Sequence, residues 1–257
     1  MRVVILAGGL GTRLSEETDV KPKPMVEIGG MPIIWHIMKT YSFYGFNDFI
    51  ICLGYKGYVI KEYFKNFLLH ESDVTIDLSK NNIIELNKST EPWKVTLIET
   101  GKETMTGGRI KRVKEYVGNN SFLLTYGDGV GNVNIKKLVN FHKNNNSICT
   151  LTSVLPPARF GALDIDAQNK INSFEEKPKG DGVWINGGFM VCDNDVFKFI
   201  ENDKTIWEQH SLPNLAKQNM LSAFKHDGFW RPMDTLNDKF KLNDLWDSGN
   251  APWKVWD

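Results

Sequence analysis

The chain has 257 residues, of which 41% are apolar and 24% charged, and it carries 31 basic and 31 acidic side chains. This length is enough for one α/β domain with a sizeable core. Because the formal net charge is zero, no overall field attracts the chain to nucleic acid or to a membrane surface. We therefore expect neither as a partner, and an anionic ligand must be met by local charge.

The cysteines Cys52, Cys149 and Cys192 are far apart in the sequence, and each lies in an apolar, strand-like run. Without paired spacing they are typical of buried free thiols in a reducing compartment. No signal peptide or membrane-spanning run is visible in the sequence. A cytoplasmic location is therefore expected.

The first element is an unbroken, largely β-branched apolar run at residues 3–7, as in a buried central strand of a parallel sheet. Three glycines follow within residues 8–11. Glycine lets a backbone approach a ligand closely, and such a turn leaves backbone N–H groups available to an anion. With the cationic Arg13 and Lys23 nearby, the stretch suits a polyphosphate.

A plain strand-to-loop turn with two solvated cations is the alternative interpretation of this stretch. Two standard phosphate motifs do not fit it. The dinucleotide fingerprint needs G-x-G-x-x-G leading directly into a helix, with an acidic residue about twenty positions further on. The Walker motif needs a Lys-Ser/Thr ending, which is missing here.

Helical and strand-like patterns alternate over the next part of the chain. Apolar residues recur at helical spacing over 33–41, residues 49–53 form a second buried strand, and a helix is expected at about 58–67. This β-α-β-α order predicts a right-handed, parallel, doubly wound sheet.

Residues 73–99 have a different pattern. Apolar and polar residues alternate in 74–78 and return in 83–86, around a turn at 80–82. The pattern predicts a β-hairpin that leaves the sheet. The alternating segment 93–99 could then rejoin the core.

Further strands are expected at 121–126 and 148–155, and helices after Gly107 and at 135–143. From residue 156 on, shorter elements are expected: strands at 161–165, 171–175, 188–192 and 221–225, and helices near 195–201, 212–218 and 236–248. No repeat or linker divides the chain. We expect one domain, residues 1–257, whose nucleotide-binding half (1–155) and sugar-binding half (156–257) share one sheet and one cleft.

The glycine turn carries the motif G-G-x-G-T-R-L, and K-P-K-P-M follows at residues 21–25. This pair resembles the signature of sugar-nucleotide pyrophosphorylases, and the resemblance covers nearly the whole chain. It implies an α/β, Rossmann-related (GT-A-like) nucleotidyltransferase fold with a mixed, mostly parallel central sheet. It also implies that residues 8–12 and Arg13 hold the β- and γ-phosphates of a nucleoside triphosphate, while Lys23 bridges its α-phosphate and the acceptor phosphate.

Asp128 lies between two glycines at the end of the strand 121–126. In open α/β sheets ligands bind beyond the carboxyl ends of the strands, so Asp128 should face the same cleft as the glycine turn, although an Asp between glycines is also a common turn former. Residues 230–234 resemble the family's W-x-D metal element in a stretched form, which implies that Asp128 and Asp234 bind a metal.

Two carboxylates and phosphate oxygens are hard donors that favour Mg²⁺. No two of the five histidines have metal-ligand spacing, which argues against zinc.

Residues 174–178 resemble the family's F-x-E-K-P element. The resemblance implies that Glu176 holds sugar hydroxyls and that Lys177 holds the phosphate of a sugar 1-phosphate. An ordinary surface stretch with salt bridges is the alternative.

Residues 185–189 resemble the N-A/G-G segment that closes the family's sugar site. Asn186, whose amide both donates and accepts, is the candidate ligand of a sugar hydroxyl, together with Gly187. Trp230 could wall the pocket, although Trp is more often part of a core.

Residues 103–109 occupy the segment that selects the base in this family. Thymidylyl- and uridylyltransferases usually carry a Gln and a Gly-Leu/Thr-Ala pattern there, whereas this chain has Thr104 and Gly107-Gly108-Arg109. An Arg side chain suits the carbonyl O2 of cytosine. Over nearly its full length the sequence is most similar to cytidylyl-transferring members. This implies CTP and α-D-glucose 1-phosphate as substrates and CDP-glucose as product, for the 3,6-dideoxyhexoses of bacterial surface polysaccharide.

The candidate catalytic residues are Arg13, Lys23 and Asp128, and a direct in-line displacement at the α-phosphorus needs no nucleophilic side chain. Two alternatives stay open: the same chemistry with UTP or dTTP, and a non-catalytic nucleotide-sugar-binding subunit that regulates a partner. We also expect a homo-oligomer. The candidate nucleotide-binding residues are Leu6, Ala7, Gly8, Gly9, Leu10, Gly11, Thr12, Arg13, Lys23, Thr104, Arg109, Gly127 and Asp128.

Overall fold

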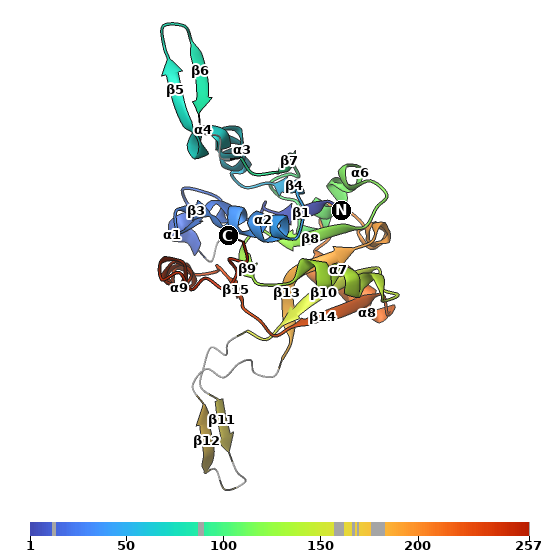
Figure 1. Cartoon of the computed structure of the whole chain (residues 1–257). Coiled ribbons are helices and arrows are strands. Elements are labelled where there is room, and N and C mark those ends of the chain that lie inside the picture. The colour runs from blue at the N-terminus through green and yellow to red at the C-terminus, as the bar shows by residue number, and fades with distance from the viewer. Residues whose placement is uncertain are drawn as a thin grey trace.

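The computed structural model describes residues 1–11, 14–86, 90–156, 162–165, 168, 170–175 and 183–256 (Figure 1). Among these residues, seven strands form one central sheet in the order β14-β10-β13-β8-β1-β4-β7. All neighbouring pairs are parallel except the two that β13 makes with β10 and β8. The expected mixed, mostly parallel sheet is therefore confirmed. Its strands are β1 (Val3–Leu6), β4 (Asp48–Leu53), β7 (Lys94–Glu99), β8 (Phe122–Tyr126), β10 (Cys149–Val154), β13 (Ile185–Cys192) and β14 (Leu221–His226).

Alternate side chains of the central strands belong to two separate apolar cores, one on each face of the sheet. Val3 and Ile5 of β1 belong to one core, and Val4 and Leu6 belong to the other. The first core is covered mainly by α2 (Ile33–Phe43), α3 (Gly57–Lys65), α7 (Ile135–Lys143), α9 (Leu236–Asp247) and Trp253 of the tail. The second is covered by α5 (Thr106–Arg112), α6 (Lys114–Val117), α8 (Leu212–Lys217), the 3₁₀-helix η3 (Asn194–Phe199) and the π-helix η4 (Trp207–Ser211).

Short elements complete the described chain. They are the helices α1 (Ser15–Thr18), η2 (Lys23–Met25) and α4 (Phe67–Glu71), and the two-stranded pairs β2 (Glu27–Ile28) with β3 (Met31–Pro32), β5 (Asp73–Asp77) with β6 (Asn82–Leu86), β9 (Gly129–Gly131) with β15 (Trp230–Pro232), and β11 (Ala162–Ile165) with β12 (Ile171–Glu175).

The expected hairpin excursion is confirmed as β5–β6, which projects from the body of the molecule (Figure 1). The segment after it does rejoin the core, because β7 pairs in parallel with β4 at the edge of the sheet. Strands from both expected halves of the chain lie in the one sheet. The division into a nucleotide-binding and a sugar-binding half stays a prediction.

The sheet brings three chain segments to one edge. The carboxyl ends of the parallel neighbours β1 and β8 lie side by side, with Leu6 opposite Tyr126. Because β13 is antiparallel to β8, it is the beginning of β13 that reaches this edge. The strand was expected to begin at residue 188, whereas β13 begins three residues earlier, at Ile185. The additional residues include Asn186 and Gly187.

Within the described part of the chain, no helix is both long enough and apolar enough to cross a bilayer. All three cysteines are buried free thiols, as their spacing predicted.

Candidate active site

A cavity of about 440 Å³ opens at this edge of the sheet. It brings together the described residues that the sequence assigned to nucleotide binding, from segments as far apart as the N-terminus and residue 128. Those on its wall are Leu6, Ala7, Gly8, Gly9, Leu10, Gly11, Lys23, Thr104, Arg109, Gly127 and Asp128. Thr12 and Arg13 lie outside the described residues.

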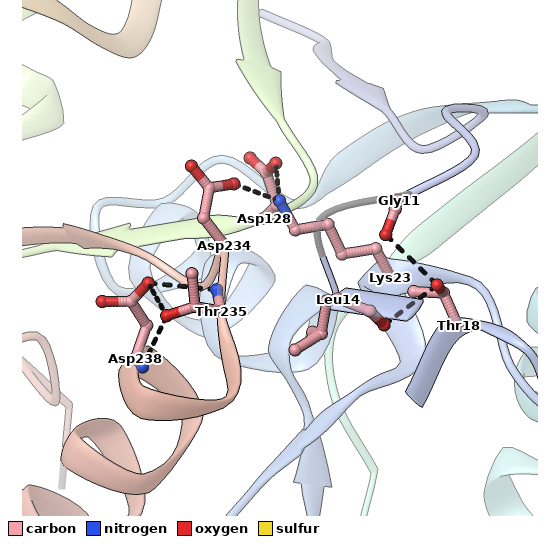
Figure 2. A network of polar contacts seen from close by, with 8 residues as sticks. All are labelled: Gly11, Leu14, Thr18, Lys23, Asp128, Asp234, Thr235 and Asp238. Atoms are coloured by element: carbon pink, nitrogen blue, oxygen red, sulfur yellow. Dashed lines mark hydrogen bonds and ion pairs between the residues drawn. The ribbon is translucent and has the colours of Figure 1, made fainter. Parts of the chain in front are cut away.

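The glycine turn is held closely against its neighbours. The carbonyl of Gly8 accepts from the N–H of Tyr55 at 3.2 Å, and a Cβ on Gly54 would lie only 2.6 Å from the same oxygen. Gly11 has φ +67°, a left-handed conformation that favours glycine, and its carbonyl accepts from Thr18 Oγ1 at 3.1 Å (Figure 2). The turn is thus a close-packed backbone surface facing the cavity, as a phosphate cradle requires.

Lys23 extends between two carboxylates (Figure 2). Its Nζ lies 2.7 Å from Asp128 Oδ2 and 2.5 Å from Asp234 Oδ1. Burial lowers the pKa of Lys23, but the negative charges of the two aspartates and their hydrogen bonds outweigh it, so the pKa is raised above 10.5. The ammonium therefore stays charged, and it marks a point where two carboxylates converge on one cation.

Backbone pairing explains how two aspartates 106 positions apart come together. Strand β9 directly follows Asp128 and pairs antiparallel with β15, which ends two residues before Asp234. The N–H of Met233 donates to the carbonyl of Asp128 at 2.8 Å, and this closes the pairing beside the two side chains. Thr235 then caps helix α9 through a capping box with Asp238, which defines where the chain turns after Asp234.

Two carboxylates are an incomplete ligand set for a metal held by protein alone. Within the described residues no group of three or more His, Cys, Asp or Glu side chains is placed to hold one. The convergence of Asp128 and Asp234 on the Lys23 ammonium nevertheless fits a hard divalent cation that takes its other ligands from phosphate and water.

Arg109 is placed differently from a residue that only reads a base. Its Nη2 donates to the carbonyl of Gly8 at 3.0 Å, and its Nη1 donates to the carbonyl of Leu53 at 3.0 Å and to Thr100 Oγ1 at 2.8 Å. Further bonds reach the carbonyls of Gly101 and Lys102. Both terminal nitrogens are thus engaged with the chain itself, and the side chain supports the glycine turn from behind. A contact with cytosine O2 would have to replace some of these bonds, and it stays a prediction.

The glycine pair in the base-selecting segment also has a packing reason. A Cβ on Gly107 would lie 2.7 Å from the carbonyl oxygen of Thr205, and one on Gly108 would lie 2.6 Å from Asp203. The main chain of residues 203–205 therefore packs directly on α5, and Met105 N donates to Asp203 O at 2.9 Å. This packing places the segment 103–109 on the cavity wall.

The described acceptor candidates lie next to the cavity. Asn186 Nδ2 donates to Tyr126 Oη at 3.3 Å, and Trp230 Nε1 donates to the carbonyl of Gly187 at 2.7 Å. Gly188 has φ +82°, and a Cβ there would lie 2.6 Å from the Tyr126 ring. The structure thus brings Asn186, Gly187 and Trp230 together, whereas Glu176 and Lys177 lie outside the described residues.

Tyr126 and Glu208 also belong to this neighbourhood, although their positions in the sequence did not predict it. Tyr126 lines the cavity and donates to Glu208, which lies on the π-helix η4. Glu208 stands in no recognisable motif, so only the fold reveals its place. A larger cavity of about 860 Å³ lies elsewhere, between Ile148 and residues 195–220, and contains none of the predicted site residues.

The chain is similar to known nucleotidyltransferases. Residues 2–247 match the family described as Nucleotidyl transferase. The chain is 61% identical over 258 positions to the glucose-1-phosphate cytidylyltransferase of Salmonella typhi, and 44% identical over 257 positions to a probable glucose-1-phosphate cytidylyltransferase of Bacillus subtilis. Both alignments cover the whole of both chains.

Among solved structures, HddC from Yersinia pseudotuberculosis complexed with GMP-PN has a TM-score of 0.69 and 27% identity. The match covers 95% of this chain and 99% of HddC. The fold and the family that the motifs predicted are thereby confirmed. The chain belongs to the nucleotidyl transferase family.

Proposed function

We propose that this protein is an enzyme that transfers a cytidylyl group from CTP to α-D-glucose 1-phosphate, forming CDP-glucose and pyrophosphate. One observation carries the proposal: the glycine turn, Lys23 and the two aspartates meet at one cavity at the carboxyl edge of the sheet. The full-length identity of 61% to a glucose-1-phosphate cytidylyltransferase supports the choice of nucleotide and sugar.

In this proposal the triphosphate lies along the glycine turn. Backbone N–H groups of residues 8–12 and the Arg13 guanidinium hold the β- and γ-phosphates, and Thr104, Arg109 and Gly127 border the nucleoside. Lys23 turns from the aspartates towards the α-phosphate and the incoming sugar phosphate. Its charge then offsets the repulsion between the two anions, which is the main obstacle to their reaction.

The reaction itself is an in-line displacement. An oxygen of the glucose 1-phosphate attacks the α-phosphorus of CTP, a new P–O bond forms, and the bond to pyrophosphate breaks on the opposite side. Positioning and charge neutralisation supply the catalysis, so the chain needs no covalent intermediate.

Asp128 and Asp234 would hold Mg²⁺, whose preference for carboxylate and phosphate oxygens fits this pair. When bound, the ion would neutralise charge at the α-phosphate and replace Lys23 as the counter-charge of the aspartates. On the acceptor side, Glu176 and Asn186 hold sugar hydroxyls, Lys177 holds the sugar phosphate, and Gly187 and Trp230 close the pocket.

Pyrophosphate release, measured with each of the four nucleoside triphosphates and glucose 1-phosphate, tests the proposal. We expect CTP to be preferred. Preference for UTP or dTTP would contradict the assigned base, and no release with any nucleotide would favour a regulatory binding subunit. Asp128→Asn should lower kcat/KM by about 10²–10³-fold while the protein stays folded. Near-normal turnover of that variant would contradict the role of Asp128.

We also propose that the product serves bacterial surface polysaccharide (O-antigen) as a precursor of 3,6-dideoxyhexoses.

We further propose that the chain forms a homo-oligomer. The hairpin β5–β6 supports this, because its side chains Ile76, Leu78 and Ile83 are 53%, 87% and 57% exposed. Sedimentation velocity should show more than one copy, and a monomer at micromolar concentration would contradict it.

A further inference from the structure

The carboxylate of Glu208 stands between the two sides of the candidate site. It lies on η4, behind the wall of the cavity, and each of its oxygens accepts from a different hydroxyl. Thr106 Oγ1 donates to Oε2 at 2.7 Å, and Tyr126 Oη donates to Oε1 at 2.5 Å. Thr106 begins α5 in the base-selecting segment, and Tyr126 ends β8. Both hydroxyl-bearing residues line the cavity.

The direction of each hydrogen bond follows from what lies on the other side of the hydroxyl. Thr106 Oγ1 accepts from the backbone N–H of Trp207 at 2.9 Å. A hydroxyl has one proton to donate, and this proton is therefore directed to Glu208.

We call the two hydrogen bonds that Glu208 accepts its arms: the nucleotide arm from Thr106 and the acceptor arm from Tyr126. The acceptor arm also runs from the hydroxyl to the carboxylate. Asn186 Oδ1 accepts from the N–H of Gly188 at 2.9 Å, which turns the Nδ2 of the same amide towards the Tyr126 hydroxyl. Because the phenol oxygen accepts from this amide, its single proton is directed to the other neighbour, Glu208 Oε1. The phenol accepts from Asn186 and donates to Glu208.

Glu208 thus receives a proton donor at both oxygens. Only a group that accepts at both positions fits this place, and a carboxylate does so. A Gln amide of the same size would direct an N–H at one of the two hydroxyl protons. One arm would then be lost, and the polarity of the remaining arm would be disturbed.

We propose that Glu208 is a positioning residue that holds the base-selecting segment through Thr106 and the acceptor residue Asn186 through Tyr126. The carboxylate orients the phenol, the phenol orients the Asn186 amide, and the amide presents its remaining donor and acceptor positions to a sugar hydroxyl. The same carboxylate defines where α5 begins on the nucleotide side. This inference rests on the proposed function, which assigns the two sides to CTP and to glucose 1-phosphate.

The two arms can be cut separately. Tyr126→Phe removes the acceptor arm, Thr106→Val removes the nucleotide arm, and Glu208→Gln disturbs both. We expect Tyr126→Phe to raise the KM for glucose 1-phosphate about tenfold with the KM for CTP changed less than about twofold, and Thr106→Val to do the reverse. Glu208→Gln should raise both KM values, with kcat reduced less than either affinity.

A double variant and a neighbouring control sharpen the comparison. Adding Tyr126→Phe to Glu208→Gln should raise the KM for glucose 1-phosphate by less than Tyr126→Phe does in the wild-type background, because Glu208→Gln already disturbs the Tyr126 hydrogen bond. Gln209→Ala, at the adjacent exposed position, should change neither KM. A purely structural role would lower the thermal midpoint or kcat and leave both KM values of Glu208→Gln unchanged. That result, or additive effects in the double variant, would overturn the proposal.

A crystal structure of Glu208→Gln separates this inference from the proposed function. We expect the Asn186 amide or the Thr106 side chain to adopt a new orientation there. If both keep their places, the proposal is wrong whatever the enzyme's activity. If the wild-type protein releases no pyrophosphate from any nucleotide, the proposed function fails, and this structural result still decides the role of Glu208.

Discussion

At the scale of single residues, the central feature is one buried ammonium shared by two carboxylates. Lys23 lies between Asp128 and Asp234, and its side chain is only 10% exposed. In so protected a place, the two carboxylates repel each other strongly unless a cation stands between them. The two carboxylates can therefore take either the lysine ammonium or a metal ion as their counter-charge.

Replacing the lysine should expose this exchange. Lys23→Ala leaves the two carboxylates facing one another, so the variant should unfold at a lower temperature than the wild type. Millimolar Mg²⁺ should then raise its thermal midpoint by several degrees more than it raises that of the wild type. This additional rise in thermal midpoint should disappear in the double variant Lys23→Ala, Asp128→Asn.

Lys21→Ala is the matched control, because Lys21 lies nearby and pairs with Glu27 outside the cluster at 2.7 Å. It should respond to Mg²⁺ as the wild type does. An equal response of Lys23→Ala and the wild type in differential scanning calorimetry would refute the shared cation site.

Arg109 provides a second prediction at this scale. Its guanidinium holds carbonyls from the glycine turn, from the end of β4 and from residues 101–102, and a lysine cannot bridge them all. Arg109→Lys should lower the free energy of unfolding by about 3 kcal/mol, since several buried carbonyls lose a charged donor. Urea unfolding measures this directly.

Arg112→Lys, on the same helix, is the control. Arg112 forms an ion pair with Asp203 at the surface, and such pairs contribute about 1 kcal/mol or less. If both variants lose the same free energy of unfolding, Arg109 does not stabilise the glycine turn.

The residues that could be predicted are those whose chemistry is local in the sequence. The glycine turn, Lys23 and Asp128 stand in short motifs, and the structure does bring them together at one cavity. The bracing by Arg109 could not be predicted, because its acceptors come from residues 8, 53 and 100–102. The role of Glu208 could not be predicted for the same reason, because its partners are also distant in the sequence.

At the scale of elements, long periodic segments were predictable and very short ones were not. Helix α7 has the bounds that its apolar spacing predicted, because nine residues give a clear period. Strands β9 and β15 have three residues each, too few to show any alternation, yet their pairing brings Asp128 and Asp234 together. The π-helix η4 has no sequence period of its own, and it carries Glu208.

Helix α2 carries a buried histidine with a defined protonation state. Trp253 Nε1 donates to His36 Nδ1 at 3.3 Å, and the other ring nitrogen lies 2.9 Å from the carbonyl of Ile28. Trp35, Trp246 and Trp256 also contact the ring. Burial lowers the pKa of His36 to about 4, so the folded protein holds it neutral.

This pKa predicts a loss of stability in acid. The unfolded chain binds a proton at His36 below about pH 6.5, whereas the folded chain resists it down to about pH 4. The contribution of neutral His36 to the free energy of unfolding is complete above pH 6.5, and it falls by about 3 kcal/mol as the pH drops to 4. Urea titrations over this range should show a steeper decline for the wild type than for His36→Gln. Parallel declines would contradict the prediction.

At the scale of the whole molecule, the one antiparallel strand among the described strands of the sheet brings the candidate acceptor residue Asn186 to the edge where the candidate nucleotide-binding residues lie. Strand β13 runs opposite to β8, so Asn186 at its beginning meets Tyr126 at the end of β8. The sequence predicted a strand here but not its direction, because direction depends on which strands it pairs with. The proposed mechanism therefore depends on where the nucleotide lies relative to this edge.

A crystal structure of the full chain with CTP and Mg²⁺ tests that directly. The triphosphate should lie against Gly8–Gly11, with Lys23 turned from Asp128 and Asp234 towards the α-phosphate. A triphosphate bound at any other place, or a Lys23 that keeps both aspartate contacts while CTP is bound, would contradict the account.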